Sequence, residues 1–168
     1  TLELWSAEGI KLTTFGGDRK SGGVYLSPDG KRIATFGNGI NLYSLDGKLL
    51  STYATATFRH MAFSPDGKHI ATCGGFKYQD DRRVEIWYSD GRRRAEIVYP
   101  ESYRDIPWVT PMQVAFTPDG KSLLVGYNYR LMEIFDLDGN RVQSIGDAGV
   151  TEISFMAQSP DGQRIIIP

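Results

Sequence analysis

The 168-residue chain contains few of the residues from which catalytic and metal centres are built. It has one cysteine, Cys73, and two histidines, His60 and His69. A single cysteine excludes an internal disulfide, and neither histidine has a cysteine or carboxylate at ligand spacing. We therefore expect no metal and no cofactor. No basic pair adjoins Cys73, which lies in a β-prone stretch, so we expect a buried and unreactive thiol.

Strong charge and long apolar runs are also absent. The net charge of −1 offers no general attraction for nucleic acid or an anionic membrane, and we expect neither as a partner. No apolar run approaches the ~18 residues of a membrane helix, and no signal-peptide pattern is visible. The lack of disulfides favours a cytoplasmic protein. No phosphate-binding loop, nucleophile elbow or dinucleotide fingerprint occurs, so the sequence predicts a protein that is not an enzyme.

What the chain does contain is an internal repeat. The turn Ser-Pro-Asp-Gly occurs at 27–30, 64–67 and 159–162, and Thr-Pro-Asp-Gly occurs at 117–120. In such turns proline presets φ, aspartate bonds to nearby backbone, and glycine accepts a positive φ. A second turn, Glu-Gly or Asp-Gly, alternates with the first, and each copy follows an apolar–aromatic pair. These pairs are Leu4-Trp5, Leu42-Tyr43, Ile86-Trp87 and Ile134-Phe135.

Short β-prone runs flank every turn, and no segment of ten or more residues keeps a helical period. Four short strands joined by tight turns form an antiparallel meander. One meander cannot bury both of its faces, so we expect an all-β fold in which several meanders stack around an axis as the blades of a β-propeller. The predicted units are the third and fourth strands of one blade at 1–17, blades at 22–54, 58–99 and 112–146, and the first and second strands of a blade at 150–168.

The repeated run apolar-Ala-Phe-Ser/Thr-Pro-Asp-Gly-Lys occurs at 61–68 and 114–121, and a strand ending in Ile-Trp and an Asp-Gly turn follow the first copy. This pattern resembles the WD40 repeats of bacterial multidomain proteins, over essentially the full chain. The resemblance implies a scaffold or recognition module that binds a protein or peptide. The family's Gly-His pair is absent, and only Asp81 lies where the family's aspartate would. We therefore do not expect its buried Asp-His-Ser-Trp hydrogen-bond network.

The first and last predicted strands are complementary, since 2–5 reads as a third strand and 164–167 as a second strand. Soluble proteins avoid an unpaired hydrophobic edge. Three arrangements remain open: closure as a four-bladed ring, pairing with another copy as a homo-oligomer, or continuation into further blades. The seven or eight blades usual in WD40-like rings favour a partial propeller completed by more chain or by a second copy. Gln158 replaces an expected apolar residue, so the last unit is either degraded or shifted in register onto Phe155.

Two insertions are the best candidates for a contact surface. One expands the connection at 74–83, and the other expands the linker at 99–111. Because strand directions alternate in a meander, both insertions emerge on the rim opposite the Pro-Asp-Gly turns. Tyr, Trp and Arg dominate interface energetics, and functional loops commonly lie on a rigid scaffold. The predicted partner-binding residues are Phe76, Tyr78, Tyr103, Arg104 and Trp108.

Several alternatives remain open at this stage. Trp108 and Ile106 would instead fill the gap between neighbouring blades if the linker folds back. The arginines at 92–94 are expected to form a solvated strand edge, or else to mark an acidic partner. A lactonase-like propeller hydrolase would need carboxylates and histidines at the central channel, where the predicted first strands are mostly apolar. A third hypothesis is a structural fragment that self-assembles into a larger ring.

Overall fold

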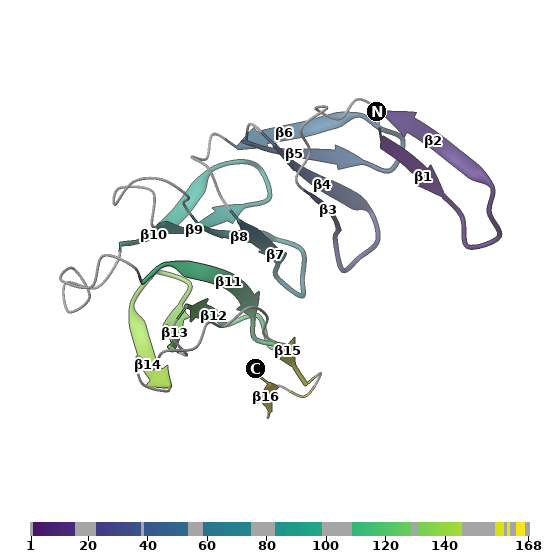
Figure 1. The fold of residues 1–168 in the computed structure, drawn as a ribbon. Coiled ribbons are helices and arrows are strands. Elements are labelled where there is room, and N and C mark those ends of the chain that lie inside the picture. Colours follow the sequence, from purple (N-terminus) through teal and green to yellow (C-terminus); the bar gives the residue numbers. More distant parts are fainter. Residues whose placement is uncertain are drawn as a thin grey trace. The chain divides into compact units, whose positions relative to one another are not determined.

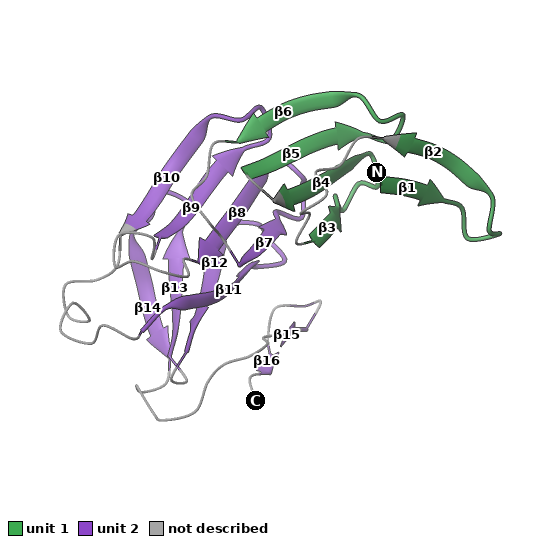
Figure 2. Cartoon of the chain, turned by 45° about the horizontal axis from the view of Figure 1, so that its top comes forward, with its two compact units in different colours: residues 1–56 green, residues 57–168 purple. Residues whose placement is uncertain are grey.

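A computed structural model of the chain describes residues 2–15, 23–37, 39–53, 59–74, 83–98, 109–128, 131–145, 157–159, 161 and 164–166. All regular structure in these ranges is β-strand. Accordingly, this part of the chain contains no helix that could span a membrane. The chain forms two compact units, residues 1–56 and 57–168 (Figure 2).

The first unit contains one hairpin and one four-stranded sheet (Figure 1). In the hairpin, β1 (Leu2–Trp5) pairs antiparallel with β2 (Lys11–Phe15). The sheet has the meander order β3–β4–β5–β6, and all its neighbouring strands are antiparallel. Its strands are β3 (Gly23–Leu26), β4 (Arg32–Gly37), β5 (Gly39–Ser44) and β6 (Leu49–Tyr53).

The second unit contains two such sheets and a short hairpin. The first sheet comprises β7 (His60–Phe63), β8 (His69–Gly74), β9 (Arg83–Tyr88) and β10 (Arg93–Val98). The second comprises β11 (Pro111–Phe116), β12 (Ser122–Tyr127), β13 (Met132–Asp136) and β14 (Arg141–Ile145). The hairpin pairs β15 (Ala157–Gln158) with β16 (Ile165–Ile166). The predicted all-β fold of four-stranded antiparallel blades is thereby confirmed, and we call each four-stranded sheet a blade.

A hydroxyl group organises each Pro-Asp-Gly turn. The Ser64 hydroxyl donates to Asp66 Oδ1 at 2.7 Å and accepts the backbone N–H of His69 at 2.9 Å. The hydroxyls of Ser27, Thr117 and Ser159 make the same two contacts in their own turns. The hydrogen bond from Ser64 also holds the pKa of the Asp66 carboxyl below its ordinary value. The repeated sequence thus encodes a turn that fixes the register of first and second strands.

The last hairpin keeps the register of the complete blades. Gln158 lies opposite Ile165 in β15–β16, as Phe63 lies opposite Ile70 in β7–β8. A shift onto Phe155, one of the two alternatives left open by the sequence, is therefore not observed. Gln158 occupies the strand position that Phe63 takes in the β7–β10 blade and Phe116 in the β11–β14 blade.

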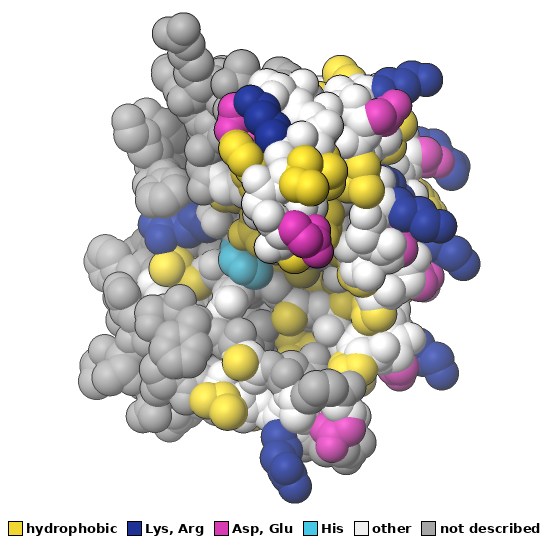
Figure 3. All heavy atoms as spheres, turned by 90° about the vertical axis from the view of Figure 1, so that its right-hand side faces the viewer, with side chains coloured by type: hydrophobic (Ala, Val, Ile, Leu, Met, Phe, Trp, Pro, Cys, Tyr) yellow, Lys and Arg dark blue, Asp and Glu magenta, His cyan; other side chains and the backbone are white. Residues whose placement is uncertain are grey.

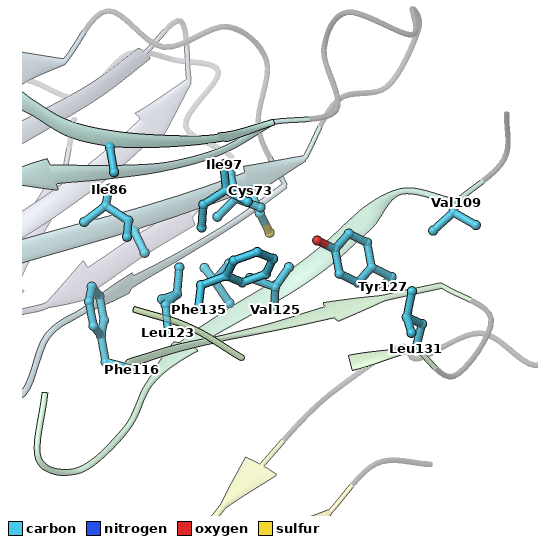
Figure 4. Packing of buried hydrophobic residues seen from close by; sticks show 14 residues of the cluster. Cys73, Ile86, Ile97, Val109, Phe116, Leu123, Val125, Tyr127, Leu131 and Phe135 are labelled. Carbon is cyan, nitrogen blue, oxygen red and sulfur yellow. The ribbon is translucent and has the colours of Figure 1, made fainter. Parts of the chain in front are cut away.

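The core of the second unit lies between its two blades, whose apolar side chains point toward one another (Figure 4). Successive residues of β12 serve opposite faces. Leu123 and Val125 join the cluster shared with the β7–β10 blade, whereas Leu124 packs on the other face with Met132 and Ile165. The blade is therefore buried on both faces, which explains the near-continuous apolar run in β12. In the first unit, Leu2 and Leu4 of the hairpin pack similarly against Ile33 and Tyr43.

Candidate functional site

The candidate surface is one end of the blades in the second unit. Because neighbouring strands are antiparallel, β8, β10 and β12 all end, and β9, β11 and β13 all begin, at the side opposite the Pro-Asp-Gly and Asp-Gly turns. We call this end the loop rim. The five predicted contact residues, Phe76, Tyr78, Tyr103, Arg104 and Trp108, all lie outside the described residues. The described residues do include those at which the two insertions leave and re-enter the blades.

The insertion after β8 begins at a very close backbone approach. Gly74 has φ +132°, and a Cβ at this position would lie 2.5 Å from the backbone nitrogen of Arg59. That nitrogen donates to the carbonyl oxygen of Cys73 at 2.8 Å. Where the insertion ends, Arg83 forms an ion pair of 2.9 Å with Glu96 on the neighbouring strand. Only glycine tolerates the geometry at Gly74, so the chain leaves β8 by a defined path, and the Arg83–Glu96 ion pair links the other end of the insertion to the neighbouring strand.

The second insertion re-enters the blade at Val109, which is fully buried. Val109 lies at the same end of the core cluster as Tyr127 and Leu131 (Figure 4). The next residue is held by two hydrogen bonds: Thr110 N–H donates to Asn128 Oδ1 at 2.7 Å, and Asn128 N–H donates to the Thr110 carbonyl at 3.1 Å. The sequence analysis did not single out Val109 or Asn128. The one sequence signal for an apolar contact at this point was the apolar Val109 directly after the predicted contact residue Trp108.

An acidic residue recurs two positions before the aromatic of the third strand, in the triplets Glu-Leu-Trp, Glu-Ile-Trp and Glu-Ile-Phe. Each carboxylate pairs with a cation eight residues later, on the fourth strand. The pairs differ in burial, because the carboxylate side chain is 42% exposed in the first, 12% in the second and 0% in the third. The sequence analysis missed this pattern. The pairs are Glu3–Lys11, Glu85–Arg93 at 3.1 Å and Glu133–Arg141 at 3.0 Å.

A buried hydrogen bond links the second and third strands of the β7–β10 blade. Trp87 Nε1–H donates to Thr72 Oγ1 at 3.4 Å. The sequence analysis expected none of the Asp-His-Ser-Trp network, because the family's Gly-His pair is missing. The pairing of β8 with β9 brings the Trp87 and Thr72 side chains together. The expectation about the complete network stays a prediction, because Asp81 lies outside the described residues.

The sequence predicted that arginines 92–94 form a solvated strand edge, and this is not true of the whole run. Arg94 forms an ion pair of 3.0 Å with Asp138, which belongs to the next blade, and only 24% of its side chain is exposed. Its other terminal nitrogen lies 3.0 Å from His69 Nε2. Burial, and then the charge of Arg94, lower the pKa of His69. The prediction is wrong for Arg94 because the stacking of two blades brings Asp138 within reach.

The remaining titratable groups that sequence reasoning considered for chemistry are engaged in packing. Val114 N–H donates to His60 Nδ1 at 3.4 Å, and burial lowers the pKa of His60. Cys73 is fully buried, and this burial raises the pKa of its thiol. Among the described residues, no group of three or more His, Cys, Asp and Glu side chains is arranged to hold a metal ion.

Repeated four-stranded antiparallel blades that stack face to face define a propeller-type repeat protein. The family model described as WD domain, G-beta repeat matches residues 47–88, a range that runs from β6 through β9. The chain thus contains a segment similar to a WD40 repeat, within a fold of repeated four-stranded blades. WD40 repeats serve in general as protein-interaction scaffolds and are typically not enzymes. A comparison with curated proteins found no match.

Proposed function

We propose that the chain is a non-catalytic recognition module whose loop rim binds a protein or peptide partner. The contact residues of this proposal are Phe76, Tyr78, Tyr103, Arg104 and Trp108. The observation that supports it most directly is that both insertions of the second unit are held at the described residues where they meet the blades. Gly74 and Arg83 hold the first insertion, and Val109 and Thr110 hold the second.

Fixed loop ends favour binding for an entropic reason. An interface residue on an untethered loop loses conformational freedom when it binds, at a cost of about 0.5–1.5 kcal/mol per ordered side chain. Loops that leave a rigid scaffold at defined points have less freedom to lose. Val109 provides a buried apolar contact at the end of the second insertion, so the chain enters β11 at a defined point.

The proposal is tested by affinity capture with the chain as bait, using the unsubstituted chain and the variants Tyr103→Ala and Trp108→Ala. We expect each variant to lower retention of a specifically captured protein at least about tenfold, because interface aromatics commonly contribute more than 1 kcal/mol. Thermal unfolding should be nearly unchanged in both variants. Leu45→Ala is the matched control, since Leu45 is exposed and lies in a turn between third and fourth strands.

Two outcomes would contradict this function. The first is a captured partner that both variants retain as well as the unsubstituted chain does. The second is a loss of thermal stability in the Trp108→Ala variant that accounts for the weaker capture. The second outcome would assign Trp108 to packing between blades, which is the alternative that the sequence left open.

A further inference from the structure

Three positions of the β7–β10 blade depart from the repeat, and their side chains meet in one place. Tyr88 follows the third-strand aromatic, where the other units have serine or aspartate. Arg94 is the second residue of the fourth strand, where the others have an apolar residue. His69 is the fifth residue after the first residue of its Pro-Asp-Gly turn, where the others have arginine or serine. The equivalents are Ser6, Ser44 and Asp136 for Tyr88, Leu12, Leu50 and Val142 for Arg94, and Arg32, Ser122 and Arg164 for His69.

Arg94 is the centre of this group. One terminal nitrogen of its guanidinium lies 3.0 Å from His69 Nε2, and the other donates to Asp138 Oδ1 at 3.0 Å. The guanidinium carbon of Arg94 lies 5.8 Å from the centre of the Tyr88 ring, and the centres of the His69 and Tyr88 rings are 5.3 Å apart. Asp138 lies in the turn between β13 and β14, so Arg94 joins two blades. We call His69, Tyr88, Arg94 and Asp138 the junction cluster.

The junction cluster lies where the apolar core between the two blades ends. Ala71 and Ile86, two positions from the cluster on β8 and β9, belong to the apolar cluster that the blades share. Residues two apart on a strand lie on the same face, so the junction cluster continues that interface toward the turns. The β13–β14 turn packs directly on β10, because a Cβ on Gly139 would lie 3.5 Å from the Ile97 side chain. A displacement of Arg94 therefore acts on the contact between the blades.

The contact with Arg94 defines the protonation state of His69. A guanidinium carries hydrogen-bond donors and no acceptor, so a ring nitrogen 3.0 Å from it must offer a lone pair. His69 is therefore neutral, with its proton on Nδ1. Elsewhere on the surface charges of opposite sign are mixed, and Figure 3 shows basic and acidic side chains interspersed on one face of the molecule. Protonation of His69 would instead place two cations in contact and replace the acceptor with a donor.

Charged groups from several elements of the second unit act on His69. Burial and then the Arg94 charge lower the pKa of His69, Asp66 in the preceding turn raises it, and Lys68 in the same turn lowers it. The remaining titratable groups that face His69 among the described residues are Tyr88 on β9 and, through Arg94, Asp138 of the next blade. Of these groups, Arg94 alone contacts both His69 and the next blade.

We propose that His69 is a pH sensor for the junction between the two blades, and that its protonation releases Arg94 and weakens the Arg94–Asp138 ion pair. The neutral imidazole accepts one hydrogen bond from the guanidinium and thereby orients it toward Asp138. The imidazolium repels the guanidinium and competes with it for the Asp138 carboxylate. Histidine changes its charge between about pH 8 and pH 5, so the junction is closed at neutral pH and loosened in mild acid. The proposal does not depend on the loop-rim function.

NMR titration of the full chain between about pH 8 and pH 5, with labelled histidine ring nitrogens, tests the proposal. The chain has two histidines, so the variant His69→Gln identifies the His69 signals by their loss. At the upper pH we expect a proton on Nδ1 of His69 and none on Nε2. The backbone amide signal of Gly139, across the junction, should shift with the same midpoint as the His69 ring, and this shift should be lost in His69→Gln. A proton on Nε2 at the upper pH, or a Gly139 signal that does not follow His69, would overturn the proposal.

The variant Arg94→Met separates the junction from a general effect of pH. It removes the guanidinium, so the titration midpoint of His69 should rise toward its ordinary value of about 6.5, and the Gly139 signal should no longer follow it. Arg92→Met is the matched control, since Arg92 also lies over the Tyr88 ring, at 5.0 Å, but pairs with Asp90 in its own turn. The control should keep both the His69 midpoint and the Gly139 response. An unchanged midpoint in Arg94→Met, or a Gly139 response that persists there, would contradict the role of Arg94.

Discussion

The three carboxylate–cation pairs between third and fourth strands form an internal series for measuring the effect of burial. The pairs share their spacing in sequence and their strand types, and they differ in the exposure of the carboxylate. The informative change is Arg141→Met, which keeps most of the apolar length of the side chain and removes the charge. It leaves Glu133 fully buried without its cation, and Glu133 Oε2 already has no hydrogen-bond partner among the described residues.

The magnitude follows from the burial of the two partners. Breaking a buried ion pair by removing one partner costs about 3–5 kcal/mol, because the other charge stays desolvated. Arg141 itself is 48% exposed, so its charge is partly solvated and the lower end of this range applies. We expect Arg141→Met to lower the free energy of unfolding by about 3 kcal/mol. Lys11→Met should leave it almost unchanged because that pair is solvent-exposed, and Arg93→Met should fall between the two.

Urea unfolding followed by tryptophan fluorescence measures these differences, provided that the slope with denaturant is unchanged. The double variant Glu133→Gln with Arg141→Met is the decisive control. It removes both charges, so it should recover most of the lost stability. Equal losses for Lys11→Met and Arg141→Met would refute the dependence on burial. A double variant no more stable than Arg141→Met alone would show that lost packing, not an unpaired charge, causes the effect.

Two further predictions concern the backbone and pH. Gly74→Ala should lower the free energy of unfolding by about 3 kcal/mol or more, because the added Cβ would collide with the backbone of Arg59. Gly9→Ala is the control: Gly9 also has a positive φ, but a Cβ there meets open space, so the loss should be about 1–2 kcal/mol. Thermal or urea unfolding measures both losses. Burial and the Arg94 charge lower the pKa of His69 in the folded chain, whereas in the unfolded chain His69 has its ordinary pKa of about 6.5. As the pH falls below that value, His69 therefore binds a proton more readily in the unfolded chain than in the folded chain. The free energy of unfolding should therefore fall between about pH 7 and pH 5. His69→Gln should reduce that fall, leaving the part due to His60, and an unchanged pH dependence would contradict the assignment.

The blades and their registers could be predicted from the sequence because the determining contacts are local. In each Pro-Asp-Gly turn, a hydroxyl, a carboxylate and a glycine within four residues set the reversal and the register. The position of the loop rim followed from strand alternation alone. The candidate contact residues, from Phe76 to Trp108, remain a prediction, since they lie outside the described residues.

Contacts between blades could not be predicted in the same way. Cys73 and Val125 belong to different blades, and they share one apolar cluster only because the two blades stack. Arg94 meets Asp138 from the next blade, so a run of three arginines read in isolation suggested solvent exposure where an ion pair is present. The sequence does not show which sheet packs against each face of a blade, because strand propensity describes single strands and not their neighbours in space.

By itself, the sequence determined short strands, hydroxyl-organised turns and a repeating meander, because these depend on chemistry within a few residues. Only the tertiary structure decided which copies of an equivalent residue are buried. Glu3 and Glu133 occupy the same repeat position with the same kind of partner, yet one is exposed and the other is fully buried. The physical reason is that solvation depends on the neighbouring sheet, and a repeat sequence specifies its own strands more directly than it specifies that neighbour.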